Sequence, residues 1–298
     1  MPDTPPPTAQ RWIHAARPKT LPAALVPVAV GCAIAYGLRG AFDATLALCT
    51  MLSAAAIQIA TNFFNDAIDF HRGADTERRL GPKRITASGE ATPRQVMAAG
   101  ALAVLAAAAL AAPLVMARGW PIVAIGLPSV YFTYGYTGGP LPLAYRGLGE
   151  LFVFAFFGIV AVAGTCFVQI GEWPAEALLG GAQVGLFSCA LLAINNLRDT
   201  DEDAQSGKRT LAVRFGKRFA RAEIAAFCLA PYALGIAFAP LGFPAAAWLP
   251  LLALPLSLAL IRGIYRHDPG AIYNKFLAFS ALQLLAFALL QCIGLVLR

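Results

Sequence analysis

Charged residues are scarce in this sequence. They fill 13% of its 298 positions, whereas a soluble domain carries roughly a quarter. Apolar residues fill 58% and fall in runs of about twenty, the length of a helix that crosses a bilayer. These two features exclude a soluble globular fold and predict an all-α, polytopic membrane protein.

Soft metal ligands in useful patterns are also missing. The six cysteines lie inside apolar runs without CxxC spacing, and the three histidines share no ligand spacing, so we expect neither disulfides nor a zinc or thiolate site. The start of the chain is polar and Pro-rich and lacks the apolar core of a cleavable signal. We expect residues 1–15 to form a disordered cytoplasmic tail.

Basic residues decide the orientation of the chain. Nine transmembrane helices are expected near residues 20–38, 43–64, 96–117, 119–137, 150–170, 176–196, 220–240, 244–262 and 275–297. With the N-terminus cytoplasmic, all but Arg39, Arg118 and Arg298 of the 23 Lys and Arg residues face the cytoplasm. This segregation accounts for the net charge of +7, so we expect the lipid bilayer as a partner and no nucleic acid. We treat residues 1–298 as a single transmembrane domain.

Two short acidic runs interrupt the apolar pattern. They occupy residues 62–69 and 195–203, at the expected cytoplasmic ends of the second and sixth spans, and each precedes a long basic loop. At about 100° per residue the polar side chains of each run share one helix face. The first stripe holds Gln58, Asn62, Asp66 and Asp69, and the second holds Asn195, Asp199 and Asp203. Facing lipid would cost several kcal/mol, so we expect both stripes to face an internal cavity.

The two stripes suit a magnesium-bound diphosphate. Mg²⁺ takes oxygen ligands and is commonly held by one or two carboxylates plus phosphate oxygens. The carboxylates are therefore candidate metal ligands, with Glu202 as the alternative to Asp203, while any single Asp could instead be a helix cap. Asp75 stays open between a ligand and a plain loop residue. Amide and basic side chains nearby are candidates to bind the diphosphate or its waters, namely Gln58, Asn62, Asn65, Lys83, Arg84, Asn195, Arg198 and Lys208.

These motifs carry a family resemblance over nearly the whole chain. Asn65-Asp66-x-x-Asp69-x-x-x-Gly73-x-Asp75, followed by Gly81-Pro82-Lys83-Arg84, resembles the first signature of the UbiA-type intramembrane aromatic prenyltransferases. Asn195-Asn196-x-Arg198-Asp199-x-x-x-Asp203, followed by Gly207-Lys208, resembles the second. Together with residues 17–22 and 136–150, they are most similar to the branch that prenylates 1,4-dihydroxy-2-naphthoate in menaquinone biosynthesis.

The resemblance implies a structure and a reaction. The nine helices would surround a central cavity that opens to lipid on one side. Mg²⁺ held by the catalytic residues Asp66, Asp69, Asp199 and Asp203 would bind a polyprenyl diphosphate, which ionises to an allylic cation. The ring of 1,4-dihydroxy-2-naphthoate would attack at the carbon bearing its carboxylate, and loss of CO₂ would give demethylmenaquinone. The resemblance places this prenyltransferase in the bacterial cytoplasmic (inner) membrane.

Other functions compete with this one. A cation-coupled transporter would place acidic residues near the bilayer midplane, whereas these lie at helix ends before basic clusters. A CDP-alcohol phosphotransferase would carry a longer acidic pattern that is absent from the chain. Another aromatic acceptor such as 4-hydroxybenzoate stays open, as do the prenyl chain length and the role of Glu150, which would pair with Arg146 or sit in the cavity. Aromatic faces near the ends of spans four and five could stabilise a cation, but we expect packing or interfacial roles for Tyr131, Tyr134, Tyr136, Phe152, Phe154, Phe156 and Phe157.

Overall fold

The computed structural model describes residues 8–73, 80–82 and 84–297, which form helices and connecting turns without a strand. The long helices are α2 (Leu21–Arg39), α3 (Ala44–His71), α4 (Pro93–Arg118), α5 (Trp120–Gly135), α8 (Ala175–Arg198), α10 (Leu211–Gly235), α12 (Leu254–Arg266) and α13 (Tyr273–Val296). Shorter helices are α1 (Thr8–Ala16), α6 (Gly149–Val153), α7 (Ala161–Ile170), α9 (Thr200–Gln205) and α11 (Pro244–Trp248). Short η segments cover Pro18–Thr20, Leu143–Tyr145, Phe154–Val160, Ile236–Phe238 and Leu249–Ala253, and the third of these, η3, is π-helical.

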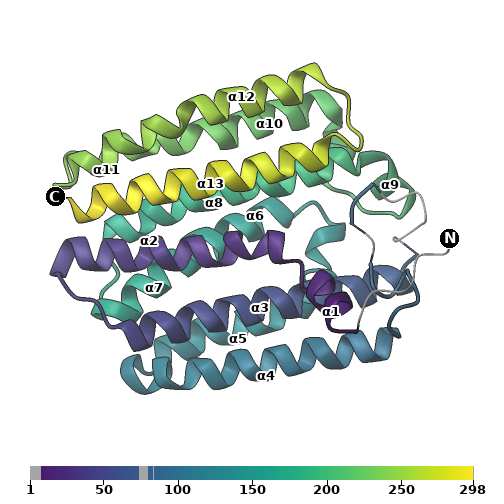
Figure 1. The fold of residues 1–298 in the computed structure, drawn as a ribbon, viewed down its shortest axis with the longest axis horizontal. Helices are drawn as coiled ribbons and strands as arrows, with labels where there is room; N and C mark the ends of the chain where they lie inside the picture. The colour runs from purple at the N-terminus through teal and green to yellow at the C-terminus, as the bar shows by residue number, and fades with distance from the viewer. Residues whose placement is uncertain (1–7, 74–79, 83, 298) are drawn as a thin grey trace.

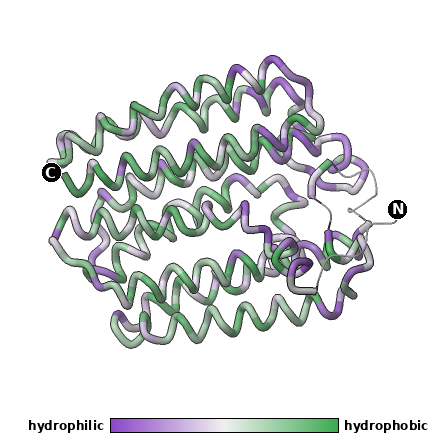
Figure 2. The backbone as a smooth tube through the Cα atoms, in the orientation of Figure 1, coloured by the Kyte–Doolittle hydropathy of each residue, from purple (hydrophilic) through white to green (hydrophobic). Residues whose placement is uncertain are grey.

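The long helices run side by side as one bundle (Figure 1). Helices α3 and α4 pack together at one edge, α10 and α12 lie at the other, and α2, α8 and α13 lie between them. The helix ends near the N-terminus carry most of the hydrophilic colour, whereas the middle of the bundle is apolar (Figure 2). Polar groups therefore gather at one end, where both acidic runs lie.

Eight helical segments of the described chain are long and apolar enough to cross a membrane. They correspond to eight of the nine expected spans. The ninth, expected at 119–137, is α5, whose 16 residues fall short of the roughly twenty that span a bilayer. Helix α5 still packs against α3 and α4 within the bundle. The protein is therefore an integral membrane protein of helical architecture, as the composition predicts.

The expected disordered tail is wrong for residues 8–15, which form most of α1; residues 1–7 lie outside the described part of the chain. Helix α1 has an apolar side that finds a partner on α3. The rings of Trp12 and Phe63 meet edge to face with centroids 5.7 Å apart, and Ala15 is buried. Burial of this apolar surface explains why a polar, Pro-rich start gives way to a helix.

A buried chain of amides fixes α8, the helix that ends in the second acidic run. Gln291 of α13 donates a hydrogen bond to Gln183 of α8, and Gln183 Nε2 donates to the Pro231 carbonyl of α10 at 2.7 Å. Both glutamines are fully buried. Side-chain hydrogen bonds of this kind tie helices together inside a membrane, where apolar contact with lipid competes with apolar contact between helices.

The segregation of charge predicts the sidedness of the bundle. In a background without the six native cysteines, Gln205→Cys at the end of α9 should react with an impermeant thiol reagent only after cells are opened. Phe42→Cys, in the α2–α3 connection at the opposite end, should react in sealed cells. Labelling of Gln205→Cys from outside sealed cells would contradict the orientation.

Candidate active site

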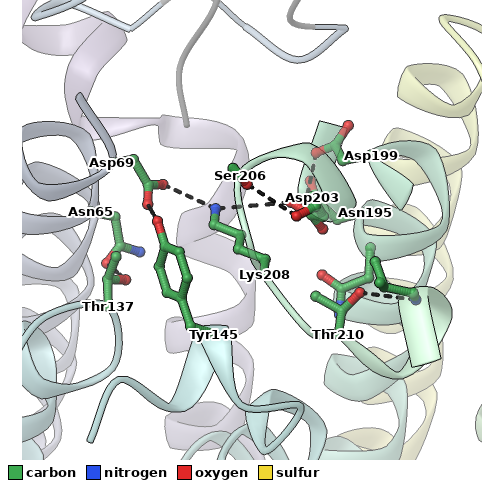
Figure 3. Close-up of polar contacts among 12 residues, drawn as sticks. Asn65, Asp69, Thr137, Tyr145, Asn195, Asp199, Asp203, Ser206, Lys208 and Thr210 are labelled. Atoms are coloured by element: carbon green, nitrogen blue, oxygen red, sulfur yellow. Dashed lines mark hydrogen bonds and ion pairs between the residues drawn. The ribbon is translucent and has the colours of Figure 1, made fainter. Parts of the chain in front are cut away.

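Lys208 brings the two acidic runs together (Figure 3). Its ammonium group lies 3.3 Å from Asp69 Oδ2 of the first run and 4.0 Å from Asp203 Oδ1 of the second. Asp69 lies 139 positions before Lys208, on the last turn of α3, while Asp203 lies on α9. The structure thus confirms no ligand set, but it does place carboxylates of both runs around one positive charge.

Asp69 is buried and heavily compensated. Besides Lys208, it accepts hydrogen bonds from Arg84 Nη2 at 3.2 Å and from the Tyr145 hydroxyl at 2.9 Å. Arg84 is itself buried. Burying a carboxylate costs free energy unless cations and hydrogen-bond donors surround it, and this cluster supplies both to Asp69.

Tyr145 is a site residue that the sequence analysis did not identify. Besides its bond to Asp69, its ring lies beneath two cations, with Arg72 at 4.3 Å and Lys208 at 5.3 Å from the centroid. Its backbone carbonyl accepts from the Arg209 amide at 3.2 Å. Burial, reinforced by the negative charge of Asp69, raises the pKa of Tyr145, so its hydroxyl stays a hydrogen-bond donor at physiological pH. The stretch 136–150 resembles the family, but no spacing within it singles out this residue.

Asp66 holds the loop that follows the first run. Its carboxylate accepts from the backbone amides of Ile85 and Thr86, both at 3.2 Å, and from the Thr86 hydroxyl. The neighbouring Asn65 accepts from the Thr137 hydroxyl, which ties α3 to the chain after α5 (Figure 3). The two side chains thus fix loops on both sides of Asp69.

In the second run, the guanidinium of Arg198 is bonded to neighbouring side chains. Its guanidinium makes two 2.6 Å hydrogen bonds to Asp199 and also bonds Asn195 at 2.9 Å and Asn274 of α13 at 2.7 Å. Asp199 and Arg198 are both buried, whereas Asp201 is exposed and pairs with Lys217. The guanidinium of Arg198 thus forms a bidentate pair with Asp199, and its contact with a diphosphate stays a prediction.

Gln58 and Asn62 lie in the predicted stripe but contact the protein itself. Asn62 Nδ2 donates to the Ala16 carbonyl at 2.9 Å and to Thr20 Oγ1 at 3.1 Å, and Gln58 Nε2 donates to Asn62 Oδ1 at 3.2 Å. Between Ala16 and Thr20 the chain turns through Arg17, whose φ of 52° is unusual for a residue with a side chain. These amides hold that turn.

The other candidate site residues lie either outside the described residues or in contact with other parts of the protein. Lys83 and Asp75 lie outside the described residues. Glu202 accepts from the Leu80 amide at 3.2 Å, on the exposed side of the loop. Glu150 does not pair with Arg146: its Oε1 accepts from Asn196 Nδ2 at 2.8 Å, beside the second run.

An apolar cavity of about 450 Å³ approaches the site from the membrane side. It is walled by α2, α3, α4, α5, η3 and α7, and its α3 lining ends at Thr61, one turn before Asn65. Phe132, Phe152 and Phe156 line this cavity and pack against one another with ring centroids 4.5 to 5.4 Å apart, which agrees with the expected packing role. The chain is π-helical from Phe154 to Val160, a local change of helix type that the sequence pattern does not predict.

Comparison with known proteins decides the family. Residues 24–290 match the UbiA prenyltransferase family. The chain belongs to the UbiA prenyltransferase family. A 1,4-dihydroxy-2-naphthoate octaprenyltransferase of Mycobacterium leprae is 36% identical over 285 residues, which cover 94% of each chain. The protein of the same name in Escherichia coli is 34% identical over 284 residues, or 88% of each chain.

Solved UbiA homologues share the fold. One from Aeropyrum pernix superposes with a TM-score of 0.68 at 19% identity, over 96% of this chain and 98% of that one. Another, from Archaeoglobus fulgidus and bound to DMAPP and Mg²⁺, gives a TM-score of 0.59 at 15% identity, over 94% and 99%. At such identities the likeness establishes the UbiA architecture of this bundle.

The donor atoms of the site fit a hard divalent cation. Among the described residues, no three carboxylate, imidazole or thiol side chains lie close enough to share one ion. One carboxylate from each run nevertheless flanks a cation already, since Lys208 lies between Asp69 and Asp203. Mg²⁺ commonly takes only one or two carboxylates and completes its shell with water and phosphate oxygens. Asp69 and Asp203 thus present carboxylate oxygens of the kind that Mg²⁺ binds, on either side of one cation.

The position of Tyr145 generates a prediction. Tyr145→Phe removes the hydrogen bond to Asp69 but keeps the ring that Arg72 and Lys208 contact. A hydrogen bond to a charged group is worth about 1.5–3 kcal/mol, so prenyl transfer should fall roughly ten- to a hundredfold. Steady-state rates of the purified variant test this, with Tyr265→Phe on the exposed side of α12 as the control. Equal rates for Tyr145→Phe and the parent would show that Asp69 needs no such partner.

Proposed function

We propose that the protein transfers a polyprenyl group from polyprenyl diphosphate to 1,4-dihydroxy-2-naphthoate, with Mg²⁺ as cofactor. The observation that carries the proposal is the meeting of both acidic runs around Lys208, together with an apolar cavity whose lining on α3 ends at Thr61, about two turns before Asp69. A charged head group fits the first of these environments and an isoprenoid tail the second. The curated relatives named as naphthoate octaprenyltransferases support the choice of acceptor.

The diphosphate would bind where Lys208 now lies. Asp69 and Asp203 would hold Mg²⁺, and Asp66 and Asp199 are the other predicted ligands. Bound Mg²⁺ would neutralise charge on the leaving diphosphate. On binding, the ammonium of Lys208 exchanges its carboxylate partners for diphosphate oxygens, and the buried Arg84 lies close enough to Asp69 to contribute a second positive charge. Both basic groups then stabilise charge that develops as the bond to the prenyl carbon breaks.

The cavity would hold the prenyl chain and protect its cation. Its lining is overwhelmingly apolar, so it offers few water molecules to trap an allylic cation. Faces of Phe132, Phe152 and Phe156 lie along the cavity and can stabilise positive charge through their ring electrons. Prenyl transfer then competes well against hydrolysis.

The bond changes define the first product. The carbon–oxygen bond to diphosphate breaks, a carbon–carbon bond forms at the ring carbon that bears the carboxylate, and the bond to CO₂ breaks. The electron pair of that last bond returns to the ring, so both hydroxyl groups are kept. The first product is therefore the hydroquinone form of demethylmenaquinone, and its quinone arises by a separate oxidation.

The proposed setting is the cytoplasmic membrane of a bacterium. The charged site lies at the hydrophilic end of the bundle (Figure 2), where a water-soluble naphthoate would reach it from the cytoplasm. The prenyl substrate can enter the cavity from the lipid. This arrangement lets one site join a polar acceptor to a membrane-bound donor.

A reconstitution assay tests the proposed reaction. Purified protein in lipid vesicles should transfer a radiolabelled prenyl group to 1,4-dihydroxy-2-naphthoate and release CO₂, and it should do so much faster than to 4-hydroxybenzoate. Chelation with EDTA should abolish transfer, and added Mg²⁺ should restore it. Faster transfer to 4-hydroxybenzoate would refute the acceptor, and full activity after exhaustive chelation would refute the metal.

The central carboxylates give a second prediction. Asp69→Asn and Asp203→Asn keep side-chain size but remove a charged metal ligand, so each should lower turnover by about two to three orders of magnitude. Asp201→Asn is the matched control, because Asp201 lies in the same run but is exposed and pairs with Lys217. Because Asp69 pairs with the buried Arg84, Asp69→Asn should also lower stability, so thermal unfolding is measured beside turnover, and turnover is compared per folded protein. Near-parental turnover by Asp69→Asn and Asp203→Asn would contradict the assigned site.

A further inference from the structure

The cytoplasmic ends of α10 and α12 carry a surface that the prenyltransferase site does not use. The two helices are joined there by Arg221, which donates to the His267 carbonyl at 2.9 Å and pairs with Asp268 at 3.2 Å. Several exposed basic and aromatic side chains lie on these two helix ends, beside the exposed Asp268. We call this set the basic–aromatic patch, and its members are Phe215, Arg218, Phe219, Arg262, Tyr265 and Arg266.

The aromatic members of the basic–aromatic patch are unusually open for their size. Phe215 is 60% exposed, Phe219 is 41% exposed and Tyr265 is 51% exposed. The rings of Phe215 and Phe219 lie against each other, with centroids 4.9 Å apart, but have little cover from the rest of the bundle. Exposed aromatic rings at the end of a membrane helix lie at the level of the lipid head groups, which suits their mixed polar and apolar surroundings.

The basic members of the patch lack acidic partners among the described residues. The nearby acids Asp201 and Asp268 are taken by Lys217 and Arg221. Arg218, Arg262 and Arg266 are exposed and pair with no described carboxylate. In contrast, Arg84, Arg198 and Lys208 at the active site are all bonded to carboxylates. The patch thus carries three uncompensated positive charges beside exposed aromatic rings.

We propose that the basic–aromatic patch binds anionic phospholipid head groups of the cytoplasmic leaflet. Sidedness alone requires positive charge at this end of the bundle, but it does not require three unpaired guanidinium groups beside uncovered rings on adjacent helices. Phosphate esters with net negative charge match the guanidinium groups, while the rings pack against the glycerol and upper acyl region. Zwitterionic lipids offer no net charge to these residues.

Arg218, the basic member of the patch on α10, is separated from the active-site loop by a break in that helix. Arg214, at the start of α10, donates to the Arg209 carbonyl at 2.9 Å and to the Arg146 carbonyl at 2.7 Å, next to Lys208 and Tyr145. Gly216, with φ 81° and ψ 171°, interrupts the helix between Arg214 and Arg218. Lipid bound beyond this break should therefore leave the active-site contacts of Arg214 unchanged.

Lipid binding to the purified full-length protein tests the proposal. Native mass spectrometry during titration with phosphatidylglycerol, and in parallel with phosphatidylcholine, measures the dissociation constant of each lipid. Each basic residue near an anionic head group contributes roughly fivefold, so the triple variant R218Q/R262Q/R266Q should bind phosphatidylglycerol about a hundredfold more weakly. Its affinity for phosphatidylcholine should not change, and neither should its prenyl transfer in neutral detergent.

Matched variants separate charge from fold. R218K/R262K/R266K keeps the charges and should bind phosphatidylglycerol within a few-fold of the parent. R262Q alone should weaken the binding of phosphatidylglycerol roughly fivefold. This single variant tests the proposal if the triple variant does not fold. Parental affinity of a folded triple Gln variant, equal affinity of the parent for both lipids, or displacement of the lipid by inorganic phosphate at millimolar level would each overturn the proposal.

Discussion

Negative charge buried at the end of a membrane bundle is the constraint on which this structure depends. Asp66, Asp69, Asp199 and Asp203 are between 1 and 8% exposed, and all four lie at the ends of apolar helices or directly after them. An ionised carboxylate that leaves water without partners costs many kcal/mol. The surrounding loops supply those partners, and their conformations follow from that task.

Each carboxylate is compensated in a different way. Backbone amides of Ile85 and Thr86 serve Asp66, a bidentate guanidinium serves Asp199, and a mixture of Lys208, Arg84 and Tyr145 serves Asp69. The ammonium group between Asp69 and Asp203 is on a flexible side chain, so a doubly charged ion and its diphosphate can replace it at modest cost. The same carboxylates and basic side chains thus stabilise the ligand-free fold and, in the proposed function, bind the metal and the diphosphate.

The sequence predicted the architecture well because hydropathy and charge segregation are properties of whole segments. Hydropathy predicted nine spans, of which eight are long and apolar enough to cross a membrane, and the family followed from the motifs in the two acidic runs. The hydrogen-bond partners of single side chains do not follow from such patterns. Nothing in the stripe that contains Gln58 and Asn62 predicts that Asn62 binds the turn at Ala16 and Thr20. Tyr145 and the π-helical turn at η3 depend on contacts between segments far apart in the chain, which periodicity cannot show. The helix α1 was missed because its apolar side is short and needs Phe63 to cover it.

In the proposed function, Mg²⁺ and diphosphate take the place of Lys208 between the two acidic runs. Anomalous diffraction at the manganese edge tests it, using crystals grown with Mn²⁺ and a prenyl thiolodiphosphate, whose bridging sulfur slows ionisation. We expect an anomalous peak that places Mn²⁺ between Asp69 and Asp203, with the Lys208 ammonium hydrogen-bonded to a diphosphate oxygen. A bound diphosphate with manganese elsewhere, and Lys208 still between the two carboxylates, would contradict it.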